Sequence, residues 1–319
     1  MKHYPCILTI AGSDCSGGAG IQADIKTISA LGAYAASAIT AITVQNTCGV
    51  TGIHAVPPTY IQGQIQAVMT DIPPISVKIG MLNDAGTIRA IAESLHRFTP
   101  YYKYIVLDPV MVSTSGCKLI EDDAIEALTS LLMPLATLIT PNLSEAEVLT
   151  GKRIATIPDM EKAAKELLAF GSQAVLVKGG HLNEAEMCDV LYIKGEDRPH
   201  LFSSPKIESR NTHGTGCTLS SAIATYLALG KPLEEAVRKA KAYVYQGILS
   251  GKDVHIGEGH GPLNHFFAPV PLRVNEELRM KNWLMYSLSA RNWLTPNVVS
   301  SFFLLHSSLK SLSLSQTLT

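Results

Sequence analysis

Residues 211–222 read NTHGTGCTLSSA. Gly214 and Gly216 bracket Thr215 just before apolar residues that recur at helical spacing, so we expect a flexible turn that leads into a helix N-terminus. Such an end can bind an anion, because its first amide N–H groups have no partner within the helix and the dipole adds partial positive charge. Cys217 lies in the expected first turn, where a thiol ionises more easily than its reference pKa of about 8.5 suggests. The segment therefore indicates phosphoryl transfer, although a glycine turn that caps an ordinary core helix, with Cys217 buried, is the alternative.

Upstream of this segment, short apolar runs alternate with amphipathic helical patterns. The expected strands are residues 6–11, 35–43, 76–82, 104–107, 138–140 and 174–177, followed by a hairpin of residues 190–193 and 201–202. Downstream, residues 233–249 have the pattern of an amphipathic helix. No repeat or linker divides residues 1–266, so the alternation predicts a doubly wound, largely parallel sheet in one α/β domain.

The composition and charge of the chain argue against several classes of function. The chain has 319 residues, 46% of them hydrophobic, with a formal net charge of -1, so it can bury one large core or two modest ones. Balanced charge and 6% aromatic residues indicate neither a nucleic-acid groove nor a polybasic membrane surface, and favour a small neutral or phosphorylated substrate. The six cysteines form no CxxC pair, and no apolar run reaches membrane-spanning length. We therefore expect a soluble, cytoplasmic protein.

Flexible or polar residues follow the first strands. Gly12 opens a glycine-rich loop, residues 12–20, that does not fit G-x-G-x-x-G, so it suits a substrate lying against the backbone better than a nicotinamide. Asp24, in the helix that follows, could reach the same pocket or could be a solvated carboxylate near a helix N-terminus. Gln45 ends a strand, and its amide can donate and accept together, as an amino-substituted heteroaromatic ring requires, unless it only caps the loop.

Charged residues follow the later strands. Asp108 stands where open α/β sheets place ligands and is a candidate for Mg²⁺ or phosphate chemistry, although such aspartates also cap loops. Asn142 and Glu145 could hold a hydrated Mg²⁺ or form a capping box, and taken alone capping is the better interpretation. Lys178 follows a buried run directly and could reach a nucleotide phosphate, and residues 110–118 could form a mobile lid. Because the candidates share strand ends and helix starts, one common site explains them better than separate capping roles.

Seven ordered motifs resemble the hydroxymethylpyrimidine/phosphomethylpyrimidine kinases of thiamine synthesis, within the ribokinase-like superfamily. They read AGSDCSGGAGIQADIKTISALGAY, ITAITVQNT, KIGML, LDPVMV, ITPNLSEAE, VKGGH and NTHGTGCTLSSA, and the match runs from about residue 5 to residue 267. The resemblance implies a three-layer α/β fold with a mostly parallel central sheet, flanking helices and a short β-hairpin excursion.

The resemblance also implies an activity. It is the phosphorylation of 4-amino-5-hydroxymethyl-2-methylpyrimidine by ATP with Mg²⁺, followed by phosphorylation of the monophosphate, in a homodimer. A pyridoxal or other vitamin kinase on the same fold, and a non-catalytic pyrimidine-binding sensor, are the alternatives.

Roles follow from the resemblance by position. Gln45 would bind the aminopyrimidine edge in a pocket lined by Gly12, Asp24, Met81 and Val110. Asp108 and Glu145 would hold Mg²⁺, while Asn142, Lys178 and Thr212 would bind ATP and its phosphates. Gly214, Thr215 and Gly216 would form an anion hole, and Cys217 would be the base where many sugar kinases of the superfamily have aspartate.

Two stretches depart from the family's pattern. In the expected lid, Thr114 stands where related enzymes often carry lysine, and Ser113 stands where a related pyridoxal-kinase branch has a second cysteine, which favours the pyrimidine. From residue 268 the pattern stops matching, and the tail is rich in serine and leucine. We therefore expect a kinase domain over residues 1–267 and an extension over residues 268–319 without a catalytic role.

Overall fold

The computed structural model describes residues 2–111, 119–179 and 186–274. Within this part of the chain, Tyr4–Val274 form one compact unit, which continues past residue 267, where the family resemblance stops. Residues 112–118, which include Ser113 and Thr114 of the expected lid, and the extension from residue 275 lie outside the described residues.

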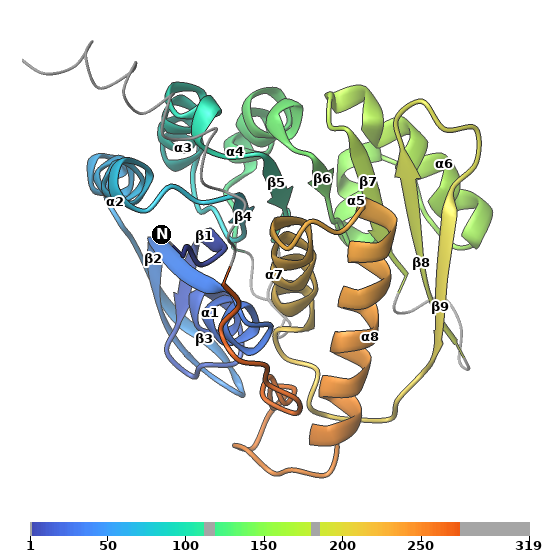
Figure 1. Cartoon of the computed structure of the whole chain (residues 1–319). Coiled ribbons are helices and arrows are strands. Elements are labelled where there is room, and N and C mark those ends of the chain that lie inside the picture. Colours follow the sequence, from blue (N-terminus) through green and yellow to red (C-terminus); the bar gives the residue numbers. More distant parts are fainter. Residues whose placement is uncertain (1, 112–118, 180–185, 275–319) are drawn as a thin grey trace, which may run out of the picture. The chain divides into compact units, whose positions relative to one another are not determined.

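The unit is built on a sheet whose strands lie in the order β3-β2-β1-β4-β5-β6-β7-β8-β9 (Figure 1). In chain order they are β1 (Cys6–Asp14), β2 (Tyr34–Asn46), β3 (Gly49–Ala55), β4 (Ser76–Ile79), β5 (Tyr104–Leu107), β6 (Leu138–Ile139), β7 (Ala174–Lys178), β8 (Glu186–Ile193) and β9 (His200–Pro205). Strands from β2 through β7 in the sheet pair in parallel, and β3, β8 and β9 add antiparallel pairs at the two edges. The expected mostly parallel sheet is confirmed.

Helices cover both faces of the sheet, so the fold has the three layers expected. One face carries α1 (Gly20–Ala30), α7 (Thr215–Ala228) and α8 (Leu233–Gly251), with α7 and α8 packed against each other (Figure 1). The other carries α2 (Pro58–Asp71), α3 (Ala85–Arg97), α4 (Asp122–Ala127), α5 (Leu143–Thr150) and α6 (Ile157–Leu167).

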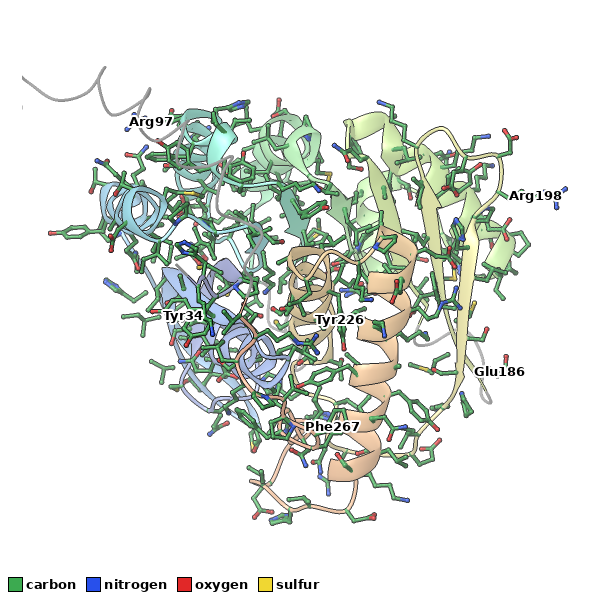
Figure 2. All side chains as sticks on the ribbon, viewed as in Figure 1. Tyr34, Arg97, Glu186, Arg198, Tyr226 and Phe267 are labelled. Carbon is green, nitrogen blue, oxygen red and sulfur yellow. The ribbon has the colours of Figure 1, made fainter. Side chains whose placement is uncertain are left out.

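Each face has its own hydrophobic core. The first core includes Ile28, Ile223 and Val237, and Phe267, labelled in Figure 2, packs against it. The second core includes Ile65 and Ile91 among many others. Strands β5 and β7 contribute to both cores, which is why they read as apolar runs. Strand β4 is buried along its length as well, but it includes the polar residues Ser76 and Lys78.

Three antiparallel pairs of consecutive strands lie toward the edges of the sheet, β2–β3, β7–β8 and β8–β9, and the sequence predicts only the last as a hairpin. The predicted β8–β9 hairpin is confirmed, and its turn contains Gly195 at a φ of 90°. Strand β3 is not among the strands predicted from the sequence: β2 continues to Asn46, the chain turns, and β3 pairs with β2. The Asn46 side chain makes that turn possible, because its Oδ1 accepts hydrogen bonds from the backbone N–H groups of Cys48 and Gly49.

The topology brings distant segments to one edge of the sheet. The strand order reverses between β1 and β4, and the carboxyl ends of parallel strands around such a point form a ligand-binding crevice. Helix α7 begins at Thr215 and packs over β4 and β5. Across the described ranges, we find no helix with both the length and the apolar character needed to cross a bilayer.

Candidate active site

A cavity of about 770 Å³ lies where these strand ends meet. Its wall contains every candidate residue named from the sequence except Asp24: Gly12, Gln45, Met81, Asp108, Val110, Asn142, Glu145, Lys178, Thr212, Gly214, Thr215, Gly216 and Cys217. Gln45 and residues 214–217 are far apart in the sequence but line the same cavity, and the roles assigned to them stay predictions.

The N-terminus of α7 is open to the cavity. Gly214 has a φ of 78°, and a Cβ at this position would lie 1.9 Å from the carbonyl oxygen of Gly18, so only glycine fits the turn. No side chain of the described residues caps the helix, which leaves first-turn amides for an anion. A Cβ on Gly216 would lie 3.4 Å from Lys178 Nζ, so these amides lie beside a cation. The turn therefore has the geometry expected of an anion site.

The expected easy ionisation of Cys217 is wrong for the ligand-free protein. Burial raises the pKa of the Cys217 thiol to about 11, and it outweighs the opposing effect of the Lys78 ammonium. Nearby carboxylates of Asp24 and Asp108 raise the pKa further. The helix N-terminus does not compensate for this loss of solvation, so Cys217 is a neutral thiol at pH 7.

Asp108 and Lys178 form an ion pair in the wall of the cavity. Lys178 Nζ lies 2.7 Å from Asp108 Oδ1, and the Thr140 hydroxyl donates to the same oxygen at 3.1 Å. Burial would lower the pKa of Lys178, but the charges of Asp108 and Glu145 outweigh it and raise that pKa. Lys178 therefore stays charged and holds Asp108 in place, close to the start of α7.

Asn142 and Glu145 form the capping box that was the preferred interpretation from the sequence. Asn142 Oδ1 accepts from the Glu145 N–H at 2.9 Å, and Glu145 Oε2 accepts from the Asn142 N–H at 2.8 Å. Glu145 also faces the cavity, so capping and a role in the site are compatible. Burial raises the pKa of Glu145 to about 7, with a smaller opposing effect from Lys178 and a further increase from Asp108.

The carboxylates of Asp108 and Glu145 fit a divalent cation. No cluster of three or more His, Cys, Asp or Glu side chains suited to a metal occurs within residues 2–111, 119–179 and 186–274. Mg²⁺, however, commonly takes one or two carboxylates and fills its other positions with water and substrate phosphates. The raised pKa of Glu145 means that its negative charge lacks compensation, and a cation between Glu145 and Asp108 would supply it.

Asp24 does not line the cavity, and the expectation that it would is corrected by the structure. Its carboxylate is fully buried and pairs with Lys78, whose Nζ lies 3.0 and 2.9 Å from the two oxygens. The hydroxyls of Thr9 and Ser221 donate to it at 2.6 Å each. Asp24 therefore supports the site from beneath, through Lys78, and does not face a ligand.

Sequence reasoning missed several polar residues of the cavity wall. Asp14 ends β1 and pairs with His213, with 2.8 Å between Oδ2 and Nε2. At the other end of the cavity, Asp189 of β8 pairs with Lys241 of α8 at 2.6 Å and accepts from the Gly179 N–H at 3.0 Å. Asp14 and His213 lie inside two of the recognised motifs, so motif membership was a usable signal, whereas β8 and α8 offered none.

Comparisons with known proteins agree with this site. The family model described as phosphomethylpyrimidine kinase matches residues 14–264. The hydroxymethylpyrimidine/phosphomethylpyrimidine kinase of Rhizobium meliloti is 51% identical over 260 residues, which cover 81% of this chain and 96% of that protein. A thiamine biosynthesis bifunctional protein of Geobacter sulfurreducens is 49% identical over 84% of this chain, and the chain spans 53% of its length.

A solved structure shares the fold. The pyridoxal kinase of Staphylococcus aureus in complex with AMP-PCP and pyridoxal matches with a TM-score of 0.75 and 33% identity, over 86% of this chain and 99% of that one. The expected ribokinase-like fold is therefore confirmed. The family match covers most of the chain and includes the cavity residues from Asp14 to Ile248, so this chain belongs to the phosphomethylpyrimidine kinase family.

Proposed function

We propose that this chain phosphorylates 4-amino-5-hydroxymethyl-2-methylpyrimidine with ATP and then phosphorylates the monophosphate, for thiamine synthesis. One observation carries the proposal: Gln45, the Asp108–Lys178 pair and the N-terminus of α7 line one cavity. That arrangement combines a donor–acceptor amide for the ring, charge for the phosphates and an anion site beside a thiol.

The substrate end of the cavity suits an aminopyrimidine. Met81 and Leu119 supply apolar wall, and Gln45 supplies an amide that can donate and accept. A Cβ on Gly12 would lie 3.0 Å from Met81 Sδ, so glycine at this position lets the Met81 side chain pack closely against the backbone of the cavity wall. The proposal requires the hydroxymethyl group of the substrate to reach Cys217, which lines the same cavity as Gln45.

The phosphate region combines three contributions. The amides of Gly216 and Cys217 at the start of α7 stabilise charge on the transferred phosphoryl group, and Lys178 adds a positive charge beside them. Asp108 and Glu145 would hold Mg²⁺, which would neutralise phosphate charge. The opposite end of the cavity, with Val244, Tyr245 and Ile248 of α8, receives the nucleotide.

Cys217 accepts the proton of the substrate alcohol as the new O–P bond forms. The step requires the thiolate, which the raised pKa of Cys217 makes a minor species at pH 7. A loose phosphoryl-transfer transition state needs the alcohol proton removed only late, so a sparsely populated base suffices. The proton passes to sulfur and regenerates the thiol.

Purified protein incubated with ATP, Mg²⁺ and the pyrimidine alcohol tests the function directly. We expect the monophosphate to appear first and the diphosphate after it, with ADP formed in proportion. No phosphorylated product and no ATP turnover in response to the pyrimidine would exclude the proposal and favour a binding protein.

Pyridoxal is the second candidate substrate, because the Staphylococcus aureus pyridoxal kinase shares the fold at 33% identity. Steady-state kinetics with both alcohols separates the two functions, and kcat/KM higher for pyridoxal than for the pyrimidine would reverse our choice. We also propose that the enzyme is a cytoplasmic homodimer, with sedimentation velocity as the test of the dimer.

A further inference from the structure

Gln45 lies in a dense hydrogen-bond network at the end of β2. Its Nε2 lies 3.2 Å from His213 Nε2, and its Oε1 lies 3.2 Å from Thr43 Oγ1. Thr43 and Gln45 are two residues apart, so their side chains lie on the same face of the strand. The pairing of β2 with β3 shifts register between Val44 and Gln45. Because the two ends of a carboxamide have nearly the same shape, the surrounding donors and acceptors decide which end carries the oxygen.

Asp14 fixes the proton on His213. The Asp14 carboxylate is buried, and it accepts hydrogen bonds from the backbone N–H groups of Ser16, Gly18 and Ala19 as well as facing His213 Nε2 at 2.8 Å. Burial would raise the pKa of Asp14, but these hydrogen bonds outweigh it and lower the pKa to about 2. A carboxylate acts only as an acceptor, so Nε2 of His213 carries a hydrogen, whether the ring is neutral or charged.

Thr43 has no hydrogen left for Gln45. A hydroxyl has one hydrogen, and that of Thr43 is directed to the carbonyl oxygen of Ser13 at 2.7 Å, the shorter of its two contacts. Thr43 is buried, so this carbonyl contact is not replaced by solvent. Thr43 Oγ1 therefore presents only lone pairs to the carboxamide of Gln45.

We propose that the carboxamide of Gln45 is held with its oxygen toward His213 and its nitrogen toward Thr43, and that these two residues set the ring specificity of the kinase. In this orientation the one Nε2–H of His213, directed mainly to Asp14 Oδ2 at 2.8 Å, is shared with Gln45 Oε1 at 3.2 Å. The Gln45 Nε2–H donates to Thr43 Oγ1. The opposite orientation places two N–H groups 3.2 Å apart and leaves the hydroxyl without a hydrogen to donate. The inference rests on the proposed function of Gln45 as the group that contacts the pyrimidine.

The orientation determines how a ring can bind. One lone pair on Oε1 and one hydrogen on Nε2 remain for the substrate, with the acceptor on the His213 side and the donor on the Thr43 side. A 4-aminopyrimidine matches them when its amino group donates to Oε1 and its ring nitrogen accepts from Nε2. A 4-oxopyrimidine has the reverse pattern, with a carbonyl and a ring N–H, so it matches only if the carboxamide turns over.

Nuclear Overhauser contacts of the Gln45 side-chain amide in the ligand-free full-length protein test the orientation without any substrate. We expect the NH₂ protons, assigned with a Gln45→Asn control spectrum, to contact the Thr43 methyl group and not the ring protons of His213. Contacts to the His213 ring with none to Thr43 would overturn the proposal.

Substrate discrimination tests the consequence. The ratio of kcat/KM for the 4-amino alcohol to that for its 4-oxo analogue should be roughly 10³ or more in the wild type. Thr43→Val frees the carboxamide to turn over, so the ratio should fall about tenfold or more through a gain in activity on the oxo analogue. Thr43→Ser keeps the hydroxyl and should keep the ratio.

Thr40→Val is the matched control, because Thr40 is also a buried β2 threonine whose hydroxyl donates to a carbonyl, that of Met81. It should leave the ratio at its wild-type value. An unchanged ratio in folded Thr43→Val, or an equal fall in Thr40→Val, would overturn the specificity role. A wild type that phosphorylates neither alcohol would count against the proposed function, and the amide contacts would still decide the orientation.

Discussion

At the scale of single residues, the fully buried Lys78–Asp24 pair lies beneath the site. Asp24 accepts from Lys78, Thr9 and Ser221. The negative charge of Asp24 is therefore well compensated. The Lys78 ammonium also interacts electrostatically with Cys217 and Asp108. Lys78 thus links an internal support of the fold to the chemistry proposed at the start of α7.

Removing the lysine should be costly. Lys78→Met leaves the Asp24 carboxylate buried without its cation, and we expect a loss of about 3–5 kcal/mol in the free energy of unfolding. Urea denaturation followed by circular dichroism measures it. The exposed pair Lys152–Glu166 provides the control: Lys152→Met should cost no more than about 1 kcal/mol. Equal, small losses in both variants would show that the buried pair contributes little.

Cys217 allows a second prediction at this scale. Cys217→Ala should lower kcat by roughly 10²- to 10⁴-fold, the usual contribution of a general base. Because the pKa of Cys217 is about 11, the thiolate fraction grows tenfold per pH unit below that value, so wild-type kcat should rise between pH 7 and 9. The rise should be absent in Cys217→Ala. If the variant keeps the wild-type rate, Cys217 has no part in proton transfer.

At the scale of elements, the start of α5 serves the fold and the site together. Its capping box uses Asn142 and Glu145, and the same glutamate accepts from the N–H of Met111, a residue of the expected lid, at 3.4 Å. Capping alone does not require a glutamate buried this deeply. Burying the charged Glu145 carboxylate raises its pKa and therefore destabilises the folded protein. A bound cation would compensate the charge and remove this destabilisation.

That cost has a definite dependence on pH. The pKa of Glu145 is about 7 in the folded protein against 4.5 for an exposed glutamate, so the folded state binds more protons between these values. The ligand-free protein should therefore lose stability as pH rises from about 4.5 to about 7. Melting temperatures of the wild type and of Glu145→Gln across this window measure the effect, because glutamine keeps the capping acceptor without the charge.

The variant should gain stability relative to the wild type as pH rises, and saturating Mg²⁺ with ATP should narrow the gap at pH 8. A difference between the two proteins that stays constant with pH would mean that Glu145 titrates normally.

What the sequence predicted at this scale depends on how much of an element is buried. Strands β1, β5 and β7 are apolar runs that pack on both faces, and they were found where expected. Strand β3 lies at an edge, is only half-buried and has a mixed composition, so no periodicity marked it. Lys78 was missed because it lies inside a buried strand, and its partner Asp24 is 54 residues away.

At the scale of the whole molecule, the site could be predicted because parallel strands have a common polarity. Residues that follow different strands meet at one edge, so Gln45, Asp108 and Lys178 needed only correct strand assignments to be placed together. Strand assignments alone do not predict which side chains form ion pairs with one another. The Asp14–His213 and Asp189–Lys241 pairs depend on side-chain packing between segments that the sequence pattern does not relate.

The end of the compact unit gives the last prediction. Residues 268–274 are attached to the unit, because the N–H groups of Val270 and Arg273 donate to the carbonyl oxygens of Ala30 and Gly32 at 2.9 and 2.8 Å. A protein that ends at Val274 keeps these bonds and every residue of the cavity, so its kcat/KM should stay within about twofold of the full-length value.

A protein that ends at Phe267 keeps the cavity but loses the two backbone hydrogen bonds, each contributing about 0.5–1.5 kcal/mol. It should therefore melt several degrees lower while its kcat/KM below the transition is unchanged. Calorimetry and steady-state assays of both truncated proteins and the full chain separate stability from catalysis. A folded but inactive protein ending at Val274 would mean that residues 275–319 act in catalysis, because every candidate site residue named from the sequence lies before that point.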